Sequence, residues 1–148
     1  MAKQVALAVI DDHPLALEGM VAICSKQPEW HVAYRGDSVI DFMSSAIQCD
    51  VVLLDLELHG QIVTPEDILA IRQKGSRVLI VSALSSPARV RKLLQAEITG
   101  FISKHENQEV LVQAITSAVA GQAWTSPDLA AILARDPLRP ALSEQEER

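Results

Sequence analysis

Aromatic residues, cysteines and long apolar runs are scarce in this sequence of 148 residues. Five aromatic residues are too few to build a surface that stacks nucleic-acid bases. The apolar run Val5–Ile10 is too short to span a membrane, and it lacks the cleavage pattern of a signal peptide. Cys24 and Cys49 are too far apart for a metal-binding pair, so we expect reduced, buried thiols in a cytoplasmic protein.

Positive charge is also in the minority, because 13 Lys and Arg stand against 19 Asp and Glu, which gives a net charge of −6. This balance argues against nucleic-acid binding by this stretch of chain itself. The contents of apolar residues, 49%, and of charged residues, 22%, are typical of one soluble globular domain. A chain of this length buries about two thirds of its unfolded surface, so the composition predicts a substantial core and excludes a disordered chain.

Short apolar runs alternate with helical patterns along the chain. The run Val5–Ile10 is apolar at every position, which is typical of a strand covered on both faces. Similar or weaker runs recur at 31–34, 51–54, 78–81 and 100–102. Each run is followed by apolar residues at helical spacing, in segments that begin near Pro14, Ser38, Thr64, Ser86 and Leu111. Five such units predict an α/β fold, a doubly wound five-stranded parallel sheet with helices on both faces.

The composition changes after the fifth unit. We expect a short sixth helix at 127–134, followed by a stretch with two prolines and three charges that is typical of a linker. The last residues begin with a capping-box pattern, as a further helix would. We therefore divide the chain into a domain at 1–121, a sixth helix and interdomain linker at 122–141, and the truncated start of another domain at 142–148.

Charged and hydroxyl side chains follow successive strands. They are Asp11 and Asp12 after the first run, Asp55 after the third, Ser82 after the fourth and Lys104 beyond the fifth. The carboxyl ends of parallel strands share one edge of a wound sheet, so these groups should converge there. Two carboxylates at about 4 Å repel by about 4 kcal/mol at an effective dielectric near 20. Lys104 and a hard dication must balance them, and Mg²⁺ fits such oxygen ligands.

A carboxylate held beside a metal ion and a lysine can attack phosphorus and form an acyl phosphate. Asp55 is the candidate nucleophile because it follows a central strand between the metal ligands and Lys104. Ser82 can donate a hydrogen bond to a phosphoryl oxygen.

Several segments that carry these residues match a known family. They are Ile10–Leu15 with Glu18–Met20, Leu53–Leu56, Val81–Ala83 and Gly100–Lys104. In this order and spacing they resemble two-component response regulators of the NarL/LuxR-type class, over residues 4 to 120. The resemblance implies the flavodoxin-like receiver fold with strand order 2-1-3-4-5. It also implies a signalling switch that is not an enzyme beyond its own phosphorylation and dephosphorylation.

The resemblance implies roles in metal binding and phosphoryl transfer. Asp55 would accept the phosphoryl group from a sensor histidine kinase. Asp12 and Asp55 would bind Mg²⁺ together with the main-chain carbonyl of Glu57, and Asp11 would act through water. Glu57 and Leu84 would stand at positions that control the access of water to the phosphoryl group.

The resemblance also implies the switch residues. Lys104 would pair with the phosphate, and Ser82, followed by Ala83, would move toward it. Phe101 would take the aromatic switch position that turns inward on activation. Phosphorylation adds about −1.5 to −2 charges, so it would bias two existing arrangements of this edge.

The last seven residues, 142–148, are similar to the start of a LuxR-type helix-turn-helix domain. By this resemblance the chain is the receiver part of a longer transcriptional regulator, and DNA is bound through the missing C-terminal domain, not through this stretch. The resemblance also implies a homodimer.

The segment 57–64 departs from the family pattern. The family usually has Met-Pro or Leu-Pro after the acceptor aspartate and a glycine a few residues on. Here His59 follows Leu58, and Val63 stands where the glycine would fall. Glu97 replaces another usual glycine. An atypical, phosphorylation-independent receiver is therefore an alternative function.

Other chemistries remain as alternatives. An aspartyl-phosphate phosphatase would need a second aspartate two residues after Asp55, where Glu57 stands. A flavin-binding module would need a phosphate cradle after the first strand, where Asp11 would repel phosphate. His59 and His105 could overhang the edge as zinc ligands, but no third ligand is near them in the sequence. We interpret His13 as a residue at the start of a helix.

Overall fold

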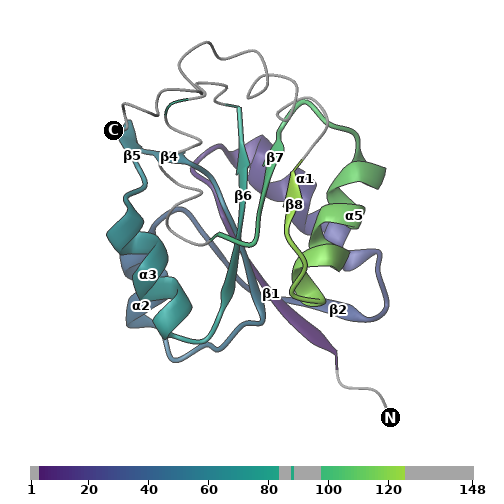
Figure 1. Cartoon of the computed structure of the whole chain (residues 1–148), viewed down its shortest axis with the longest axis horizontal. Helices are drawn as coiled ribbons and strands as arrows, with labels where there is room; N and C mark the ends of the chain where they lie inside the picture. Colours follow the sequence, from purple (N-terminus) through teal and green to yellow (C-terminus); the bar gives the residue numbers. More distant parts are fainter. Residues whose placement is uncertain (1–3, 84–87, 89–97, 126–148) are drawn as a thin grey trace, which may run out of the picture.

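A parallel sheet forms the centre of the computed structural model, which describes residues 4–83, 88 and 98–125 (Figure 1). Its strands are β1 (Val5–Ile10), β2 (Trp30–Gly36), β3 (Val51–Leu54), β6 (Arg77–Ser82), β7 (Gly100–Ser103) and β8 (Trp124–Thr125). Their spatial order is β2-β1-β3-β6-β7-β8. The first five of these strands confirm the predicted order 2-1-3-4-5.

Helices cover both faces of this sheet, as the alternating pattern predicts. They are α1 (Pro14–Ser25), α2 (Val39–Ser44), α3 (Pro65–Gln73) and α5 (Gln108–Val119). Figure 1 shows α2 and α3 on one side of the sheet and α1 and α5 on the other. The helices expected near 86–94 and at 127–134, and the segment 142–148, lie outside the described residues. No helix in the described part of the chain is long and apolar enough to cross a membrane.

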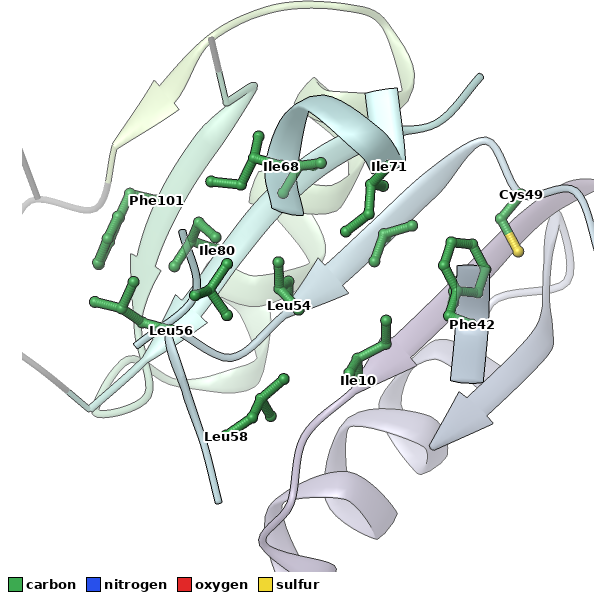
Figure 2. Close-up of a cluster of buried hydrophobic side chains, with 14 residues drawn as sticks. Ile10, Phe42, Cys49, Leu54, Leu56, Leu58, Ile68, Ile71, Ile80 and Phe101 are labelled. Carbon is green, nitrogen blue, oxygen red and sulfur yellow. The ribbon is translucent and has the colours of Figure 1, made fainter. Parts of the chain in front are cut away.

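The apolar strands contribute side chains to two separate hydrophobic cores. Successive side chains of a strand point to opposite faces, so Ala8 and Ile10 pack with the α2/α3 side, whereas Leu7 and Val9 pack with the α1/α5 side. Figure 2 shows the α2/α3 core, in which Phe42 lies among side chains from the strands and α3. Burial on both faces therefore explains why these strands do not alternate between apolar and polar residues.

A short sixth strand extends the sheet where the sequence indicates a linker. β8 pairs with β7 in parallel, and the Trp124 N–H donates to the Thr99 carbonyl over 3.2 Å. The pairing depends on Gly100, because a Cβ there would lie 2.7 Å from the Trp124 carbonyl oxygen. A strand of two residues has no periodicity to read, which is why the sequence did not predict it.

Helix α2 begins at its predicted cap but ends early. The Ser38 hydroxyl accepts a hydrogen bond from the Asp41 N–H, as expected for an N-cap. The apolar spacing continues to Ile47, yet the helix ends at Ser44. The Lys74 ammonium donates to the carbonyl oxygens of Phe42 and Ser45 over 2.9 and 2.7 Å. This lysine from the end of α3 therefore satisfies carbonyls that a longer helix would have used.

The atypical segment after β3 forms a hairpin. Strands β4 (Glu57–Leu58) and β5 (Gln61–Ile62) pair antiparallel. The two residues between them, His59 and Gly60, have φ values of 52° and 78°. Positive φ at both central residues of a two-residue loop is the type I′ geometry that suits the twist of paired strands. The departure from the family pattern thus has a defined local structure.

Replacement of Gly100 by alanine tests the β7–β8 pairing. We expect Gly100→Ala to lower the free energy of unfolding by about 1–3 kcal/mol, because the new Cβ would overpack against the Trp124 carbonyl. Urea unfolding measures this loss, and hydrogen exchange of the Trp124 amide reports on β8 itself. Gly19→Ala is the matched control, because Gly19 lies inside α1 with open space at its Cβ position and should gain about 0.5–1 kcal/mol. Unchanged stability with a protected Trp124 amide in Gly100→Ala would contradict the proposed packing.

Candidate functional site

Backbone pairing places Asp11, Asp55 and Lys104 at one edge of the sheet. The Asp11 N–H donates to the Gly36 carbonyl and the Asp55 N–H to the Ile10 carbonyl, each over 3.0 Å. The backbone hydrogen bonds between parallel strands thus continue one residue beyond the end of β1 and of β3. They fix the backbone positions of Asp11 and Asp55. The Lys104 N–H donates to the Ser82 carbonyl over 2.9 Å, so the lysine is tied to the end of β6 as well.

The ammonium of Lys104 lies between two buried carboxylates. Its Nζ is 2.7 Å from Asp11 Oδ2 and 3.0 Å from Asp55 Oδ2. The Lys104 ammonium donates a hydrogen bond to Asp55, whereas its contact with Asp11 is an ion pair. The side chains of Asp11 and Asp55 are 0% and 4% exposed. Buried charges of this kind are tolerated only when they are paired.

Burial and charge shift the pKa values of this group. Burial raises the pKa of Asp55, and the negative charge of Asp11 adds to the rise, while Lys104 offsets only a part of it. Burial by itself would lower the pKa of Lys104, but Asp55 and Asp11 raise it above its ordinary value. The lysine is therefore held in its charged form at neutral pH.

Asp12 is held by the hairpin. Its Oδ2 accepts a hydrogen bond of 2.8 Å from the backbone N–H of His59, in the turn between β4 and β5. Its Oδ1 is buried and has no hydrogen-bond partner among the described residues. Burial by itself would raise the pKa of Asp12. The His59 N–H and the charges of His13 and His59 lower this pKa by a larger amount, so that it lies below its usual value. Asp12 Oδ1 thus makes no hydrogen bond among the described residues, and its contact is the His13 ring nitrogen at 3.2 Å.

His13 belongs to the site, although the sequence suggested only a helix-start residue. It precedes α1 but its side chain makes no capping hydrogen bond. Its Nδ1 instead lies 3.2 Å from Asp11 Oδ1, 3.2 Å from Asp12 Oδ1 and 3.6 Å from Asp55 Oδ2. Its position directly after two aspartates was the available signal.

The site can hold a divalent cation. One ligand atom from each of Asp11, Asp12, His13 and Asp55 lies within 4.8 Å of the others. Three carboxylates supply the oxygen ligands that Mg²⁺ prefers, and Asp12 Oδ1, which makes no hydrogen bond among the described residues, is the kind of atom that a bound cation would satisfy. The backbone of Glu57, at the start of β4, is one of the groups that lower the pKa of Asp55.

The predicted switch residues lie at the neighbouring strands. Ser82 ends β6, is buried, and pairs in register with Ser103. Ala83 follows it and is exposed. Phe101 already points inward, fully buried in the α2/α3 core (Figure 2). Leu84, predicted to control access of water, lies outside the described residues, as does Glu97.

The alternative of a zinc site at His59 and His105 gains no support from the metal-type cluster found in the described part of the chain. The imidazole of His59 lies 3.3 Å from Asp37 and 4.0 Å from Asp12. His105 follows Lys104, and its backbone N–H donates to the Ser103 hydroxyl. Neither histidine belongs to the metal-type cluster, where His13 stands instead.

Comparison with known proteins identifies a family for this geometry. Residues 7–116 match the family described as the response regulator receiver domain. The probable transcriptional regulatory protein NarL of Mycobacterium tuberculosis is 30% identical over 155 residues, which cover 97% of this chain and 71% of NarL.

Solved structures agree with the sequence comparison. A LuxR-family two-component response regulator from Aurantimonas superposes with a TM-score of 0.80 at 28% identity, over 89% of this chain and 96% of the other. The signal receiver domain of the putative response regulator NarL from M. tuberculosis superposes with a TM-score of 0.74 at 30% identity, over 82% of this chain and all of the other.

Removal of the lysine charge tests the electrostatic balance of the site. We expect Lys104→Met to lower the free energy of unfolding at pH 7 by about 2 kcal/mol, because two buried carboxylates lose their counter-charge. The pKa of Asp55 is already raised, and it would rise further without the lysine. A carboxyl with a raised pKa destabilises the fold above that pKa, so the deficit should shrink as the pH falls through it and the group is protonated.

Urea unfolding with EDTA at pH 7 and at pH 5 measures this difference. Lys26→Met is the matched control, since Lys26 is exposed at the end of α1 and should change the stability by less than about 0.5 kcal/mol. A deficit of equal size at both pH values would show that Lys104 acts by packing and not by charge.

Proposed function

The chain belongs to the response regulator receiver domain family, and on this premise we propose that Asp55 accepts a phosphoryl group. The family predicted from the sequence motifs is thereby confirmed. One observation carries the proposal of Asp55: its carboxylate is buried within 3.0 Å of the Lys104 ammonium and inside a cluster of ligand atoms that can hold a cation. The proposed nucleophile, its cationic partner and the proposed metal ligands are therefore close together in the folded chain.

The phosphoryl donor we propose is a phosphohistidine of a sensor histidine kinase. An oxygen of Asp55 attacks phosphorus, the P–N bond of the donor breaks, and the leaving imidazole takes up a proton. Asp12 and Asp55 would hold Mg²⁺ with the main-chain carbonyl of Glu57, and Asp11 would act through water. A bound Mg²⁺ supplies positive charge against the transferring oxygens. Lys104 is placed to stabilise the same developing negative charge.

The acyl phosphate would change the charge balance at the edge of the sheet. It carries about −1.5 to −2 charges in place of one carboxylate charge. Lys104 would follow this charge away from Asp11, and the Ser82 hydroxyl at the end of β6 would donate to a phosphoryl oxygen. Ala83 directly follows β6 and Phe101 lies on the adjoining strand β7, so we propose that they transmit the change to the neighbouring surface.

The output we propose is control of transcription. Residues 1–121 would be the receiver domain, 122–141 a sixth helix with an interdomain linker, and 142–148 the start of a helix-turn-helix domain. DNA would be bound by the rest of that domain, as part of a homodimer, since the net charge of −6 disfavours DNA contact by this stretch itself. A transcriptional role is supported by the similarity to the probable transcriptional regulatory protein NarL, of which the chain covers 71%.

An alternative is a receiver that signals without phosphorylation. The His13 imidazole approaches all three carboxylates, and the β4–β5 hairpin holds Asp12. If these contacts persist in the presence of Mg²⁺, the pocket stays closed to a phosphoryl donor. In that case regulation would act through the hairpin and not through Asp55.

Phosphorylation by a small donor separates the two functions. We expect incubation with Mg²⁺ and acetyl phosphate to add the mass of one phosphoryl group, and Asp55→Asn to abolish the gain, because the amide is a far weaker nucleophile. Intact-protein mass spectrometry measures both. Asp41→Asn is the matched control, since Asp41 lies in the first turn of α2 and should leave the gain unchanged. No gain in the wild-type chain would favour the phosphorylation-independent receiver, and a gain in Asp55→Asn would place the acceptor elsewhere.

Glu57 should set the lifetime of the acyl phosphate. Its backbone is one of the groups that lower the pKa of Asp55, and its side chain is half-buried. We expect Glu57→Ala to change the rate of dephosphorylation by about threefold or more, or about 0.7 kcal/mol in the barrier, because the side chain controls the path of the attacking water. The loss of the phosphoryl mass with time, after removal of the donor, measures the half-life. Glu66→Ala, in the first turn of α3, is the control, and an unchanged half-life in Glu57→Ala would exclude this role.

A further inference from the structure

We propose that the pocket also binds a transition-metal dication, Zn²⁺ above all, with His13 as a nitrogen ligand, and that this ion inhibits phosphorylation of Asp55. The inhibitory part rests on the proposed function, whereas the binding part does not. The site that the family motifs imply is an all-oxygen magnesium site. The structure adds an imidazole to it, and imidazole is a ligand that suits Zn²⁺ far better than Mg²⁺.

The ligand spacing fits a four-coordinate ion. Bonds of 2.0–2.2 Å to nitrogen and oxygen place the ligands of a tetrahedral zinc site about 3.3–3.6 Å apart. The His13 Nδ1 is 3.2 Å from oxygens of Asp11 and Asp12 and 3.6 Å from an oxygen of Asp55. Three of the tetrahedral edges are thus present within about 0.1 Å before any ion enters.

The surroundings supply what a zinc site needs beyond its ligands. The Oδ2 of Asp12 is held by the His59 N–H, which leaves its buried Oδ1, without a hydrogen bond in the described structure, for the ion. Lys104 contacts Asp11 through Oδ2, whereas His13 contacts Oδ1, so the lysine and the ion would use different oxygens of this residue. At Asp55 both Lys104 and His13 contact Oδ2, so an ion there would share this oxygen with the lysine or use the other one. The side chain of His13 is 67% exposed, which gives the ion a path from solvent.

The two cysteine thiols of the described residues do not form a competing metal site. Cys24 and Cys49 are buried in different cores, on opposite faces of the sheet. Burial raises the pKa of Cys24 to about 12 and that of Cys49 to about 11, so both thiols stay protonated and do not bind metal at neutral pH.

Occupation by Zn²⁺ would block the chemistry of the site. Three carboxylates and one imidazole complete a four-coordinate shell, and such closed shells are typical of structural zinc sites, which keep no open position. A phosphoryl oxygen would then find no place on the ion, and the Asp55 lone pair would be committed to a metal bond. Mg²⁺ keeps several waters and leaves room for phosphate. The two ions should therefore have opposite effects at one pocket.

Titration calorimetry of the tag-free protein tests the ligand role of His13. We expect His13→Gln to lower the affinity for Zn²⁺, relative to that for Mg²⁺, by about tenfold or more, or about 1.4 kcal/mol, because only Zn²⁺ gains from the nitrogen. His105→Gln is the matched control for surface histidines and should bind Zn²⁺ as the wild type does. Zinc should also shift the side-chain ¹⁵N signals of His13. An unchanged affinity ratio, or tighter binding of both ions by His13→Gln, would show that the imidazole only blocks the carboxylates and would overturn the proposal.

Competition in the acetyl phosphate reaction tests the inhibition. One equivalent of Zn²⁺ in excess Mg²⁺ should suppress the phosphoryl mass gain of the wild-type chain, and suppress it less in His13→Gln, each compared with its own zinc-free level. If Zn²⁺ binds through His13 but the gain persists, the inhibition is refuted while the binding site stands. A protein that shows no gain even without zinc fails the proposed function instead, and the calorimetry remains decisive for the site.

Discussion

The repulsion among three carboxylates at one edge of the sheet is the constraint on which the rest of this site depends. Asp11 and Asp55 are almost fully buried, and Asp12 is close to them. Two unit charges at such distances repel by several kcal/mol, even at an effective dielectric near 20. Lys104 balances part of this charge from the neighbouring strand end, and the remainder makes the pocket a receptor for cations. The capacity to hold a metal ion is therefore a consequence of the fold, since the backbone fixes where these aspartates lie.

The sheet can impose this arrangement because its centre is rigid and dry. β1 and β3 pair in register at Ile10 and Leu54. One core covers one face of both strands, and a second core covers the opposite face. The residues after these strands inherit their positions from the ladder, so Asp11 and Asp55 lie side by side without any contribution from their own side chains. Moving them apart would require breaking backbone hydrogen bonds within the two cores. The fold therefore maintains the electrostatic strain of the site.

Much of this was predictable from the sequence, because it follows from strand order and from the rule that parallel strands end together. Runs such as Val5–Ile10 revealed the strands, and the polar residues after them, Asp55 and Lys104 among them, then had to meet. The features that sequence reasoning missed depend on details with no period. β8 has two residues, and the early end of α2 is stabilised by Lys74 from another helix. The position of the His13 side chain follows from a backbone torsion at the start of α1 that residue types do not specify.

The hairpin is the most instructive of these features. The sequence showed that 57–64 departs from the family pattern, and a departure in a loop is commonly interpreted as a loss of structure. Here it produces a type I′ turn whose first residue, His59, donates its N–H to Asp12. One oxygen of Asp12 is thus used by the hairpin and the other is left for the pocket.

The contacts of the three carboxylates cannot all persist when the pocket is occupied. His13 lies against oxygens of all three, and Lys104 contacts Asp11 and Asp55. A metal ion or a phosphoryl group needs the same oxygens, so binding has to redistribute contacts that begin at several different elements. Because Asp12 is also bonded to the hairpin, a change in its charge changes the strength of that bond. The hairpin, the start of α1 and the end of β7 are therefore coupled through one set of oxygens, which is the arrangement that a switch requires.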